Sequence, residues 1–387
     1  MLKRSYRTVL LACLAVGCND VTSAPGRLGN GDELRPAFAA RVLTVSVKPA
    51  SSTINVGQTV QLTASSKPAK KAMYVWSTSN SAVAKVSATG LVTGLAAGTA
   101  TITATSEGKS GTASVTVSAA PPGGTSVTLV GAGDIASCSS SGDEATAALV
   151  DTMPGTVFTA GDNAYSDGSA LNFTNCYQPS WGKFKARTRP SPGNHDYHIS
   201  GAADYYAYYG SNAGPAGRGY YSYNLGAWHI ISLNSEVGMT AGSAQETWLR
   251  QDLAGSTAKC TLAYWHKPRW SSGTQHGSNS AAQAVWQALY DYGADVVVQG
   301  HEHNYERFAP KNGSGALDPS FGVRSFVVGA GGVGHYNDKG TAVLGSEVFN
   351  GTTWGVLKLT LGQTSYSWQF VPVAGGTFTD AGTGQCH

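Results

Sequence analysis

Hydrophobic and polar residues alternate in short runs between residues 42 and 118. The apolar positions of these runs are Leu43, Val45, Val47, Val60, Leu62, Val83, Val86, Val92, Ile102, Val115 and Val117. A period of two is typical of strands that bury one face, and turn residues separate the runs at short intervals. The pattern therefore predicts a small β-sandwich.

The pattern changes after residue 126, where apolar strand-like runs alternate with helical segments. This alternation predicts an α/β domain built from layers of sheet and helix. Two capping boxes, Ser243 with Glu246 and Ser280 with Gln283, each precede the apolar positions of a helix. We therefore expect helices to begin at these two serines.

Two segments rich in small and turn-forming residues, 18–41 and 119–125, separate these units and predict a flexible tether and a linker. The chain has 387 residues, 41% of them hydrophobic, which is enough to bury two cores. The sequence thus predicts an all-β domain at 42–118 and an α/β domain at 126–387.

Residues 1–17 have the pattern of an export signal, with Lys3, Arg4 and Arg7 ahead of an apolar run too short to span a bilayer. Residues 14–18, Leu-Ala-Val-Gly-Cys, resemble the lipobox of bacterial lipoproteins, which implies a lipid anchor at Cys18. Residues 10–13 fit the lipobox better but would leave an apolar core of only five residues. We expect export to a bacterial cell envelope with this anchor, or otherwise secretion after ordinary cleavage.

Charge is sparse, since Asp, Glu, Lys and Arg make up 13% of the chain, whereas Gly accounts for 49 residues. This profile suits an extracellular, turn-rich protein. Residues 1–17 hold three of the 26 basic residues and none of the 23 acidic ones, so the charges balance without them. No cluster of Lys and Arg remains, which argues against a nucleic acid or a polybasic membrane face as partner. Membrane contact is expected only through the lipid anchor.

Five polar clusters each follow an apolar or extended run in the α/β region. They are Gly133-Asp134, Gly161-Asp162, Gly193-Asn194-His195-Asp196, His266 and Gly300-His301-Glu302-His303. Because ligands gather at the carboxyl ends of strands in such sheets, we expect the clusters to converge on one crevice. Each cluster alone is more typical of a turn or a buried histidine, and it is their joint occurrence that predicts a site.

The residue types in these clusters are metal ligands. Carboxylate, amide oxygen and imidazole bind iron, manganese and zinc. His301 and His303, two residues apart, would point to the same side of an extended segment. A carboxylate can bridge two ions about 3.5 to 4 Å apart, which is the geometry that clamps the attacking and leaving oxygens in phosphoryl displacement.

The ordered set Gly-Asp, Gly-Asp-x-x-Tyr, Gly-Asn-His-Asp, His and Gly-His-x-His resembles the signature of calcineurin-like metallophosphoesterases, over residues 126–373. Tyr165, three residues after Asp162, and the run Gly-His-Glu-His-Asn-Tyr-Glu-Arg at 300–307 resemble the purple acid phosphatase branch. The fold that this resemblance implies has two packed β-sheets flanked by helices. Ile135-Ala136 and Ala263 depart from the usual pattern, but they affect packing rather than ligands.

The resemblance implies roles for nine residues. Ferric iron would be held by Asp134, Asp162, Tyr165 and His303, and a divalent ion (iron, zinc or manganese) by Asp162, Asn194, His266 and His301. His195 would face the phosphate as a charge stabiliser, and His276 would protonate the leaving group. The implied reaction is hydrolysis of phosphate monoesters by metal-bound hydroxide. The alternatives are a phosphodiesterase or nucleotidase on the same scaffold, and a non-catalytic surface adhesion protein.

Four stretches of the β-domain resemble the bacterial Ig-like domain, group 2. They are Val-Gly-Gln-Thr-Val-Gln-Leu-Thr-Ala at 56–64, Trp-Ser-Thr-Ser-Asn at 76–80, Val-Ala-Lys-Val at 83–86 and Gly-Leu-Val-Thr-Gly-Leu-Ala-Ala-Gly-Thr at 90–99. The resemblance implies a spacer or adhesive module without chemistry of its own. Its contact would be a cell surface or a polysaccharide.

Four of the six cysteines, Cys138, Cys176, Cys260 and Cys386, lie beyond the signal. In an oxidising envelope they predict two disulfides, for which three connectivities exist. We favour Cys138 with Cys176, since both lie shortly after metal-motif loops. The second pair would then be Cys260 with Cys386, which ties down the C-terminus.

Overall fold

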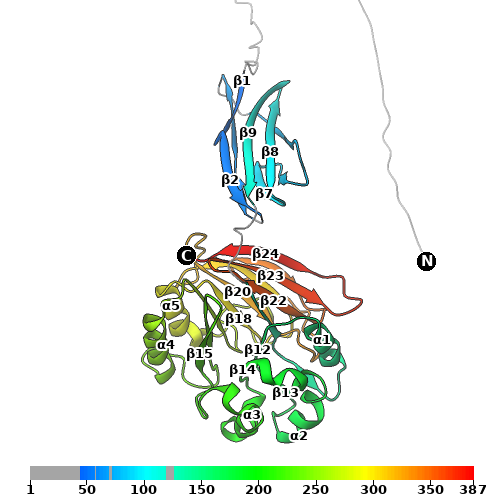
Figure 1. Cartoon of the computed structure of the whole chain (residues 1–387), viewed down its shortest axis with the longest axis vertical. Helices are drawn as coiled ribbons and strands as arrows, with labels where there is room; N and C mark the ends of the chain where they lie inside the picture. The colour runs from blue at the N-terminus through cyan, green and yellow to red at the C-terminus, as the bar shows by residue number, and fades with distance from the viewer. Residues whose placement is uncertain (1–43, 57, 69–71, 119–125) are drawn as a thin grey trace, which may run out of the picture.

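The computed structural model describes residues 44–56, 58–68, 72–118 and 126–387, which form an N-terminal β-domain and a C-terminal domain of sheets and helices (Figure 1). The predicted signal (1–17), tether (18–41) and linker (119–125), with the anchor at Cys18, lie outside the described residues. Within the described ranges, no helix is long and apolar enough to cross a lipid bilayer.

The described residues of the N-terminal domain form nine strands. A two-stranded sheet pairs β1 (Thr44–Lys48) with β4 (Thr63–Lys67). A three-stranded sheet has the order β3 (Thr59–Gln61), β7 (Leu91–Gly94), β6 (Ala84–Val86). A four-stranded sheet has the order β2 (Ser51–Asn55), β9 (Lys109–Ser118), β8 (Gly98–Ser106), β5 (Val75–Thr78). Alternate residues point inward, so that Val45, Leu62, Val92, Ile102 and Val115 are buried in one core. The alternation of the sequence predicted this core correctly.

The C-terminal domain contains two large sheets. The six-stranded sheet has the order β14 (Thr188–Ser191), β12 (Thr156–Ala160), β10 (Val127–Ala132), β22 (Gly355–Leu361), β23 (Ser365–Pro372), β24 (Asp380–Gln385). The seven-stranded sheet has the order β15 (Tyr221–Leu225), β16 (Trp228–Ser232), β17 (Cys260–Tyr264), β18 (Val296–Gln299), β20 (Val323–Val328), β19 (Tyr305–Lys311), β21 (Ser346–Asn350). A short pair joins β11 (Ala136–Ser137) to β13 (Ala164–Tyr165).

Helices and short helical turns complete this domain. The α-helices are α1 (Gly142–Asp151), α2 (Ala170–Asn172), α3 (Ala203–Tyr209), α4 (Ala244–Gly255) and α5 (Gln283–Asp291). A π-helical turn covers Phe173–Tyr177, and 3-10 turns cover Trp181–Arg187, Asp196–His198, Ser200–Ala202, Gly210–Ala213 and Ser280–Ala282. In Figure 1, α4 and α5 lie together on one flank of the sheets and α1 lies on the other.

The seven-stranded sheet is buried on both faces. Ile230 belongs to the cluster that also contains Leu129 and Phe158 of the six-stranded sheet. The next residue, Ile231, belongs to a second cluster with Trp286 of α5. Adjacent strand residues point to opposite faces, so one face packs on the other sheet and the opposite face packs on helices. The predicted architecture of two packed sheets flanked by helices is confirmed.

A cross-sheet polar cluster, defined here as Tyr305, Arg307, Trp368 and Asp380, links β19 to the last two strands of the other sheet. One oxygen of Asp380 accepts from the Tyr305 hydroxyl at 2.6 Å, from Arg307 Nε at 2.7 Å and from Trp368 Nε1 at 3.1 Å. The cluster thereby fixes the start of β19, directly after the Gly-His-x-His segment.

Both predicted disulfides, Cys138 with Cys176 and Cys260 with Cys386, are confirmed. The first ties the segment after β11 to the π-helical turn. The second closes a loop of sequence separation 126 and joins the start of β17 to the penultimate residue. Cross-links of this kind restrict the unfolded chain and are typical of exported proteins.

One of the two predicted helix starts is correct. The Ser243 side chain accepts from the Glu246 amide at 3.2 Å and caps α4. The start at Ser280 is wrong, because the side chain of Asn279 accepts from the Ala281 amide at 3.0 Å and caps a 3-10 turn ahead of α5. The Gln283 side chain accepts from Arg269 at 2.6 Å, which makes it unavailable for a capping box.

Replacing Ser243 by alanine is expected to lower the free energy of unfolding by about 1 kcal/mol, because one amide at the start of α4 loses its partner. Ser280→Ala serves as the matched control and is expected to change stability by less than about 0.5 kcal/mol. Denaturant unfolding followed by tryptophan fluorescence measures both, since every tryptophan except Trp76 lies in the C-terminal domain. Equal losses in the two variants would contradict the corrected cap.

Candidate metal centre

The predicted polar clusters lie at the carboxyl ends of strands from both sheets. Asp134, Asp162 and Asn194 follow the parallel strands β10, β12 and β14 of the six-stranded sheet. His266 and His301 follow the parallel strands β17 and β18 of the seven-stranded sheet. The strand ends of the two sheets meet, and the predicted convergence on one place is present in the structure.

A first group of donor atoms surrounds the hydroxyl of Tyr165. This oxygen lies 2.9 Å from Asp134 Oδ1, 3.0 Å from Asp162 Oδ2 and 3.3 Å from His303 Nε2. All four side chains are buried. Their oxygen and nitrogen atoms form one compact donor set drawn from three separate loops.

A second group surrounds His266 Nε2. Asn194 Oδ1, Asp162 Oδ2 and His301 Nδ1 each lie 3.1 Å from this nitrogen. Asp162 Oδ2 therefore belongs to both groups. Two donor sets that share one carboxylate oxygen are the arrangement a bridging ligand needs.

The far ring nitrogens of two histidines are held by backbone carbonyls. His266 Nδ1 donates to Ala160 O at 2.8 Å, and His303 Nδ1 donates to Gly334 O at 2.9 Å. Each Nε2 is thereby turned toward the donor set, where it can carry either a proton or a metal ion. The two backbone carbonyls therefore fix the tautomer that a metal ligand requires, with the proton on Nδ1 and Nε2 free to bind a metal ion.

The buried carboxylates of Asp134 and Asp162 favour positive charge among the donor atoms. Burial by itself lowers the pKa of the His266 imidazole, but the charges of Asp162 and Asp134 outweigh burial and raise this pKa to about 10. Burial and the same two carboxylates raise the pKa of the Tyr165 phenol well above its ordinary value. A cation placed among these atoms meets that demand, so the donor set fits metal ions.

The backbone is bent sharply at the donor residues. Asp134, Asp162 and His301 have positive φ angles of 59°, 50° and 72°, a region that residues other than glycine rarely adopt. The prediction that His301 and His303 lie on an extended segment is wrong. The chain turns at His301 because its amide donates to Asp134 Oδ2 at 2.7 Å, and the two rings consequently join different donor groups.

The turn that carries Asn194 is built around two residues whose role the motif alone did not reveal. Asp196 is fully buried and accepts from the Gly193 amide and from Asn163 Nδ2, each at 2.9 Å. Burial, which is the larger cause, and the negative charge of Asp162, which is the smaller one, together raise the pKa of Asp196 to about 7. A Cβ atom at Gly193 would collide with the Asp162 carboxylate, so only glycine lets the turn approach this closely.

His195 and His276 lie at the edge of the donor set. His195 Nε2 is 3.9 Å from Asp162 Oδ2, and its Nδ1 lies 2.5 Å from Ser166 O. The exposed His276 stacks on His301 with ring centroids 4.0 Å apart. All nine residues predicted for the site are thus brought together, with these two accessible to solvent.

Sequence reasoning missed Tyr336. Its ring stacks on His303 with centroids 4.0 Å apart and planes 7° apart, and its amide donates to His303 O at 3.0 Å. Tyr336 follows a glycine-rich run at 329–334, directly after β20, and that run at the end of a strand was the available signal.

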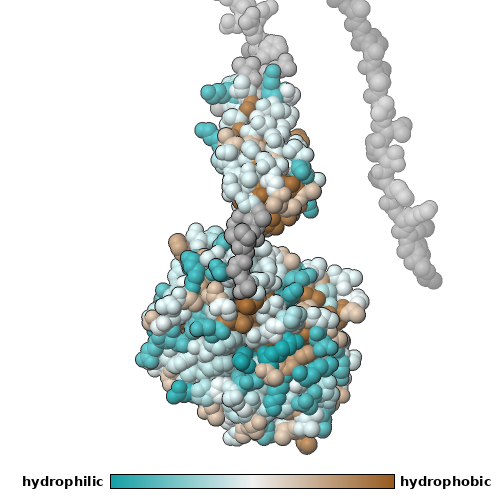
Figure 2. Space-filling view, viewed as in Figure 1, coloured by the Kyte–Doolittle hydropathy of each residue, from teal (hydrophilic) through white to brown (hydrophobic). Residues whose placement is uncertain are grey.

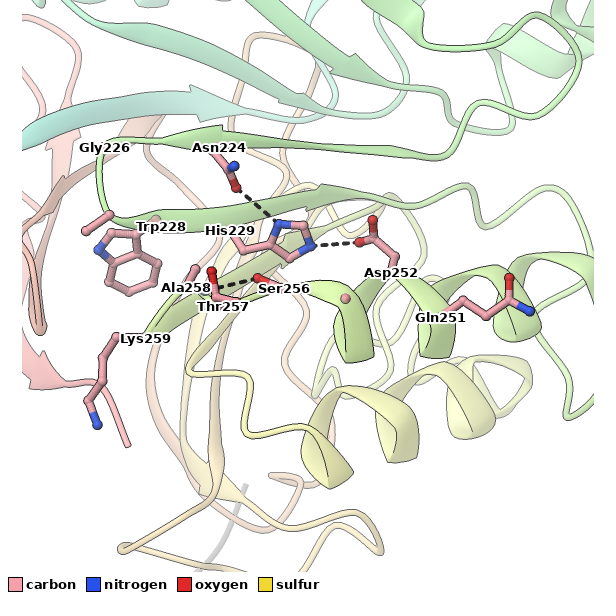
Figure 3. Close-up of a pocket in the computed structure, with 12 residues that line it drawn as sticks. Asn224, Gly226, Trp228, His229, Gln251, Asp252, Ser256, Thr257, Ala258 and Lys259 are labelled. Carbon is pink, nitrogen blue, oxygen red and sulfur yellow. Dashed lines mark hydrogen bonds and ion pairs between the residues drawn. The ribbon is translucent and has the colours of Figure 1, made fainter.

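A pocket of about 660 Å³ lies at the opposite end of β17, between the β15–β16 turn and the α4–β17 connection (Figure 3). Its His229 Nε2 is 2.7 Å from Asp252 Oδ2, and its Nδ1 is 3.5 Å from Asn224 Oδ1. Asp252 also accepts from Ser222 Oγ at 2.6 Å. Both ring nitrogens face protein groups, so this histidine–carboxylate pair fastens the hairpin to α4.

The C-terminal domain combines two packed β-sheets with a donor set that fits metal ions. Residues 128–305 match the family of calcineurin-like phosphoesterases, and residues 41–117 match the bacterial Ig-like domain (group 2). The chain therefore carries a bacterial Ig-like domain followed by a calcineurin-like phosphoesterase domain.

The relatives of the chain include purple acid phosphatases. Purple acid phosphatase 15 of Arabidopsis thaliana is 29% identical over 220 residues, which cover 48% of this chain and 41% of the relative. The chain thus spans about two fifths of the curated relatives that it matches.

Two solved structures share the fold. Purple acid phosphatase PPD1 from yellow lupin seeds has a TM-score of 0.55 and 16% identity, covering 88% of this chain and 68% of that chain. GAP50, described as the anchor in the inner membrane complex of Plasmodium, has a TM-score of 0.52 and 14% identity, covering 68% and 89%. At these identities the likeness concerns the fold alone.

Replacing the shared aspartate, Asp162→Asn, is expected to remove metal from both donor groups, because the anionic oxygen common to them is lost. Elemental analysis of purified protein measures the metal per chain, and circular dichroism checks the fold. Asp151→Asn, at the exposed end of α1, is the matched control and should keep its metal. Two metals per chain in the Asp162 variant would contradict the shared role.

Proposed function

We propose that the C-terminal domain hydrolyses phosphate monoesters with two metal ions, as a purple acid phosphatase-like enzyme. One observation carries the proposal: Asp162 Oδ2 is shared by the group around Tyr165 and the group around His266. Ions held in the two groups would lower the pKa of water and offset the negative charge of a phosphate ester.

The two groups differ in the ion they suit. The first contains a phenol oxygen and two carboxylates, which are hard donors that favour ferric iron. The second contains two imidazoles, one amide oxygen and the shared carboxylate, which suit divalent iron, zinc or manganese. The proposed ligands are Asp134, Asp162, Tyr165 and His303 for the first, and Asp162, Asn194, His266 and His301 for the second.

Two histidines would act on the substrate. The contact of His195 Nδ1 with Ser166 O turns Nε2 toward the donor groups, where it would donate to a phosphate oxygen as charge builds in the transition state. His276 is exposed beside His301 and would give a proton to the departing oxygen. Binding and proton delivery would thus come from two different loops.

Hydrolysis of an aryl phosphate, compared with its bis-aryl diester, tests the proposal. We expect the metal-replete protein to cleave the monoester faster, and chelation followed by iron and zinc to abolish and then restore turnover. Faster cleavage of the diester would favour a phosphodiesterase on the same scaffold. If protein with both metals bound cleaves neither ester, the hypothesis of a non-catalytic surface adhesion protein applies.

Tyr165→Phe tests the iron assignment. A phenolate bound to ferric iron gives a charge-transfer colour, so iron-loaded protein is expected to be pink to purple, and the variant is expected to lose that colour while its fold persists. The absorption spectrum in the visible range measures this. Tyr177→Phe, a buried tyrosine outside the donor groups, is the control and should keep the colour. Colourless oxidised protein with iron bound would refute the assignment.

The proposal also covers the cellular location of the protein. Two disulfides support export, and we place the anchor at Cys18, with the Ig-like domain (42–118) as a spacer before the catalytic domain (126–387). Figure 2 shows hydrophobic residues gathered at one end of the Ig-like domain. Such a surface supports a contact with the cell surface or a polysaccharide.

A further inference from the structure

Glu302 separates two proposed metal ligands, His301 and His303, and is fully buried. Its Oε1 atom accepts from two consecutive amides, His276 N at 2.7 Å and Gly277 N at 2.6 Å. The carboxylate of Glu302 therefore contacts the loop that carries the proposed proton donor. In the motif Gly-His-x-His this residue occupies the variable position.

The second oxygen of Glu302 is enclosed by the same loop. Oε2 is buried and has no hydrogen-bond partner among the described residues. A Cβ atom at Gly273 would collide with it, so the loop passes this oxygen at a distance that only glycine permits. The segment from Gly273 to Gly277 thus wraps around the carboxylate, with consecutive amides turned inward as in an anion-binding nest.

A second buried carboxylate holds the beginning of this loop. Glu306 accepts from the Ser272 amide at 2.8 Å and from Ser346 Oγ at 2.6 Å. Backbone amides that donate to a carboxylate make stronger hydrogen bonds than those that donate to neutral groups. The loop is therefore held at both ends by residues that follow β18, on the segment that also supplies His301 and His303.

The His276 ring has few contacts of its own. It is exposed and makes ring contacts with His301, at 4.0 Å between centroids, and with Tyr336, at 5.7 Å. The main-chain bonds to Glu302 are consequently what determines where this ring can lie.

We propose that Glu302 is a positioning residue that holds the 273–277 loop so that His276 faces the leaving group of the phosphate ester. The inference rests on the proposed function, in which His276 is the proton donor. Glu302 itself does not touch the substrate and acts through the backbone of His276.

Leaving-group dependence tests this role. For Glu302→Ala we expect kcat on an alkyl phosphate such as glycerol phosphate to fall about 100-fold, because a misplaced donor no longer protonates a basic alkoxide. The rate with 4-nitrophenyl phosphate should change little, since 4-nitrophenolate departs without a proton. Glu302→Gln, whose amide oxygen can still accept from both amides, should recover most of the alkyl phosphate rate. Gln275→Ala, at an exposed neighbouring position, is the control and should match the parent protein.

A double-mutant cycle shows whether Glu302 acts through His276. Glu302→Ala combined with His276→Ala should be no slower on the alkyl phosphate than His276→Ala alone. Gly273→Ala should reproduce the leaving-group-dependent loss with the carboxylate intact, and it serves if Glu302→Ala does not fold. Additive losses, or equal losses on both esters, would overturn the proposal.

Amide hydrogen exchange tests the contact between Glu302 and the 273–277 loop without relying on catalysis. In Glu302→Ala the amides of His276 and Gly277 should exchange faster than in the parent protein, with metal content unchanged. Unchanged exchange, or loss of metal, would overturn the positioning role and leave Glu302 as a support for its neighbouring ligands. If the parent protein cleaves no monoester, the proposed function fails. Faster exchange in the variant would still establish that Glu302 holds the 273–277 loop.

Discussion

The structure of the C-terminal domain depends on the carboxylate of Asp162. One oxygen accepts from the His195 amide at 2.8 Å, which fixes the turn that carries Asn194. The other lies 3.0 Å from the Tyr165 hydroxyl and 3.1 Å from His266, which follows the seven-stranded sheet, whereas Asp162 follows the six-stranded sheet. A buried carboxylate in such a place is costly unless positive charge accompanies it. The two sheets can therefore close over this point only with a proton or a metal ion included.

The donor residues could be predicted from the sequence because they stand at strand ends, where local patterns place them. Asp134, Asp162 and His266 each follow a buried strand, and their chemistry is that of metal ligands whatever the details of packing. Tyr336 escaped prediction because its contact with His303 spans 33 positions without any periodic relation. The cap at Ser280 was predicted wrongly for a similar reason: the partner of Gln283, Arg269, lies on another loop.

The fold by itself does not establish catalysis. GAP50, which is described as an anchor, shares the fold with a TM-score of 0.52, as does a purple acid phosphatase with 0.55. What favours an enzyme here is the complete donor set, together with the backbone carbonyls of Ala160 and Gly334 that orient two of its histidines. A scaffold protein has no need of such oriented imidazoles.

The pairing of β10 has a consequence for the order of assembly. Asp134 follows this strand, which lies between β12 and β22, and Val127 pairs with Leu361 more than 230 positions later. Contacts of such long sequence separation close slowly and form late in folding. The donor atoms of the candidate metal centre are therefore brought together only after nearly the whole C-terminal domain is available to fold. The compartment in which the domain folds would therefore decide which ions are offered to these donor atoms.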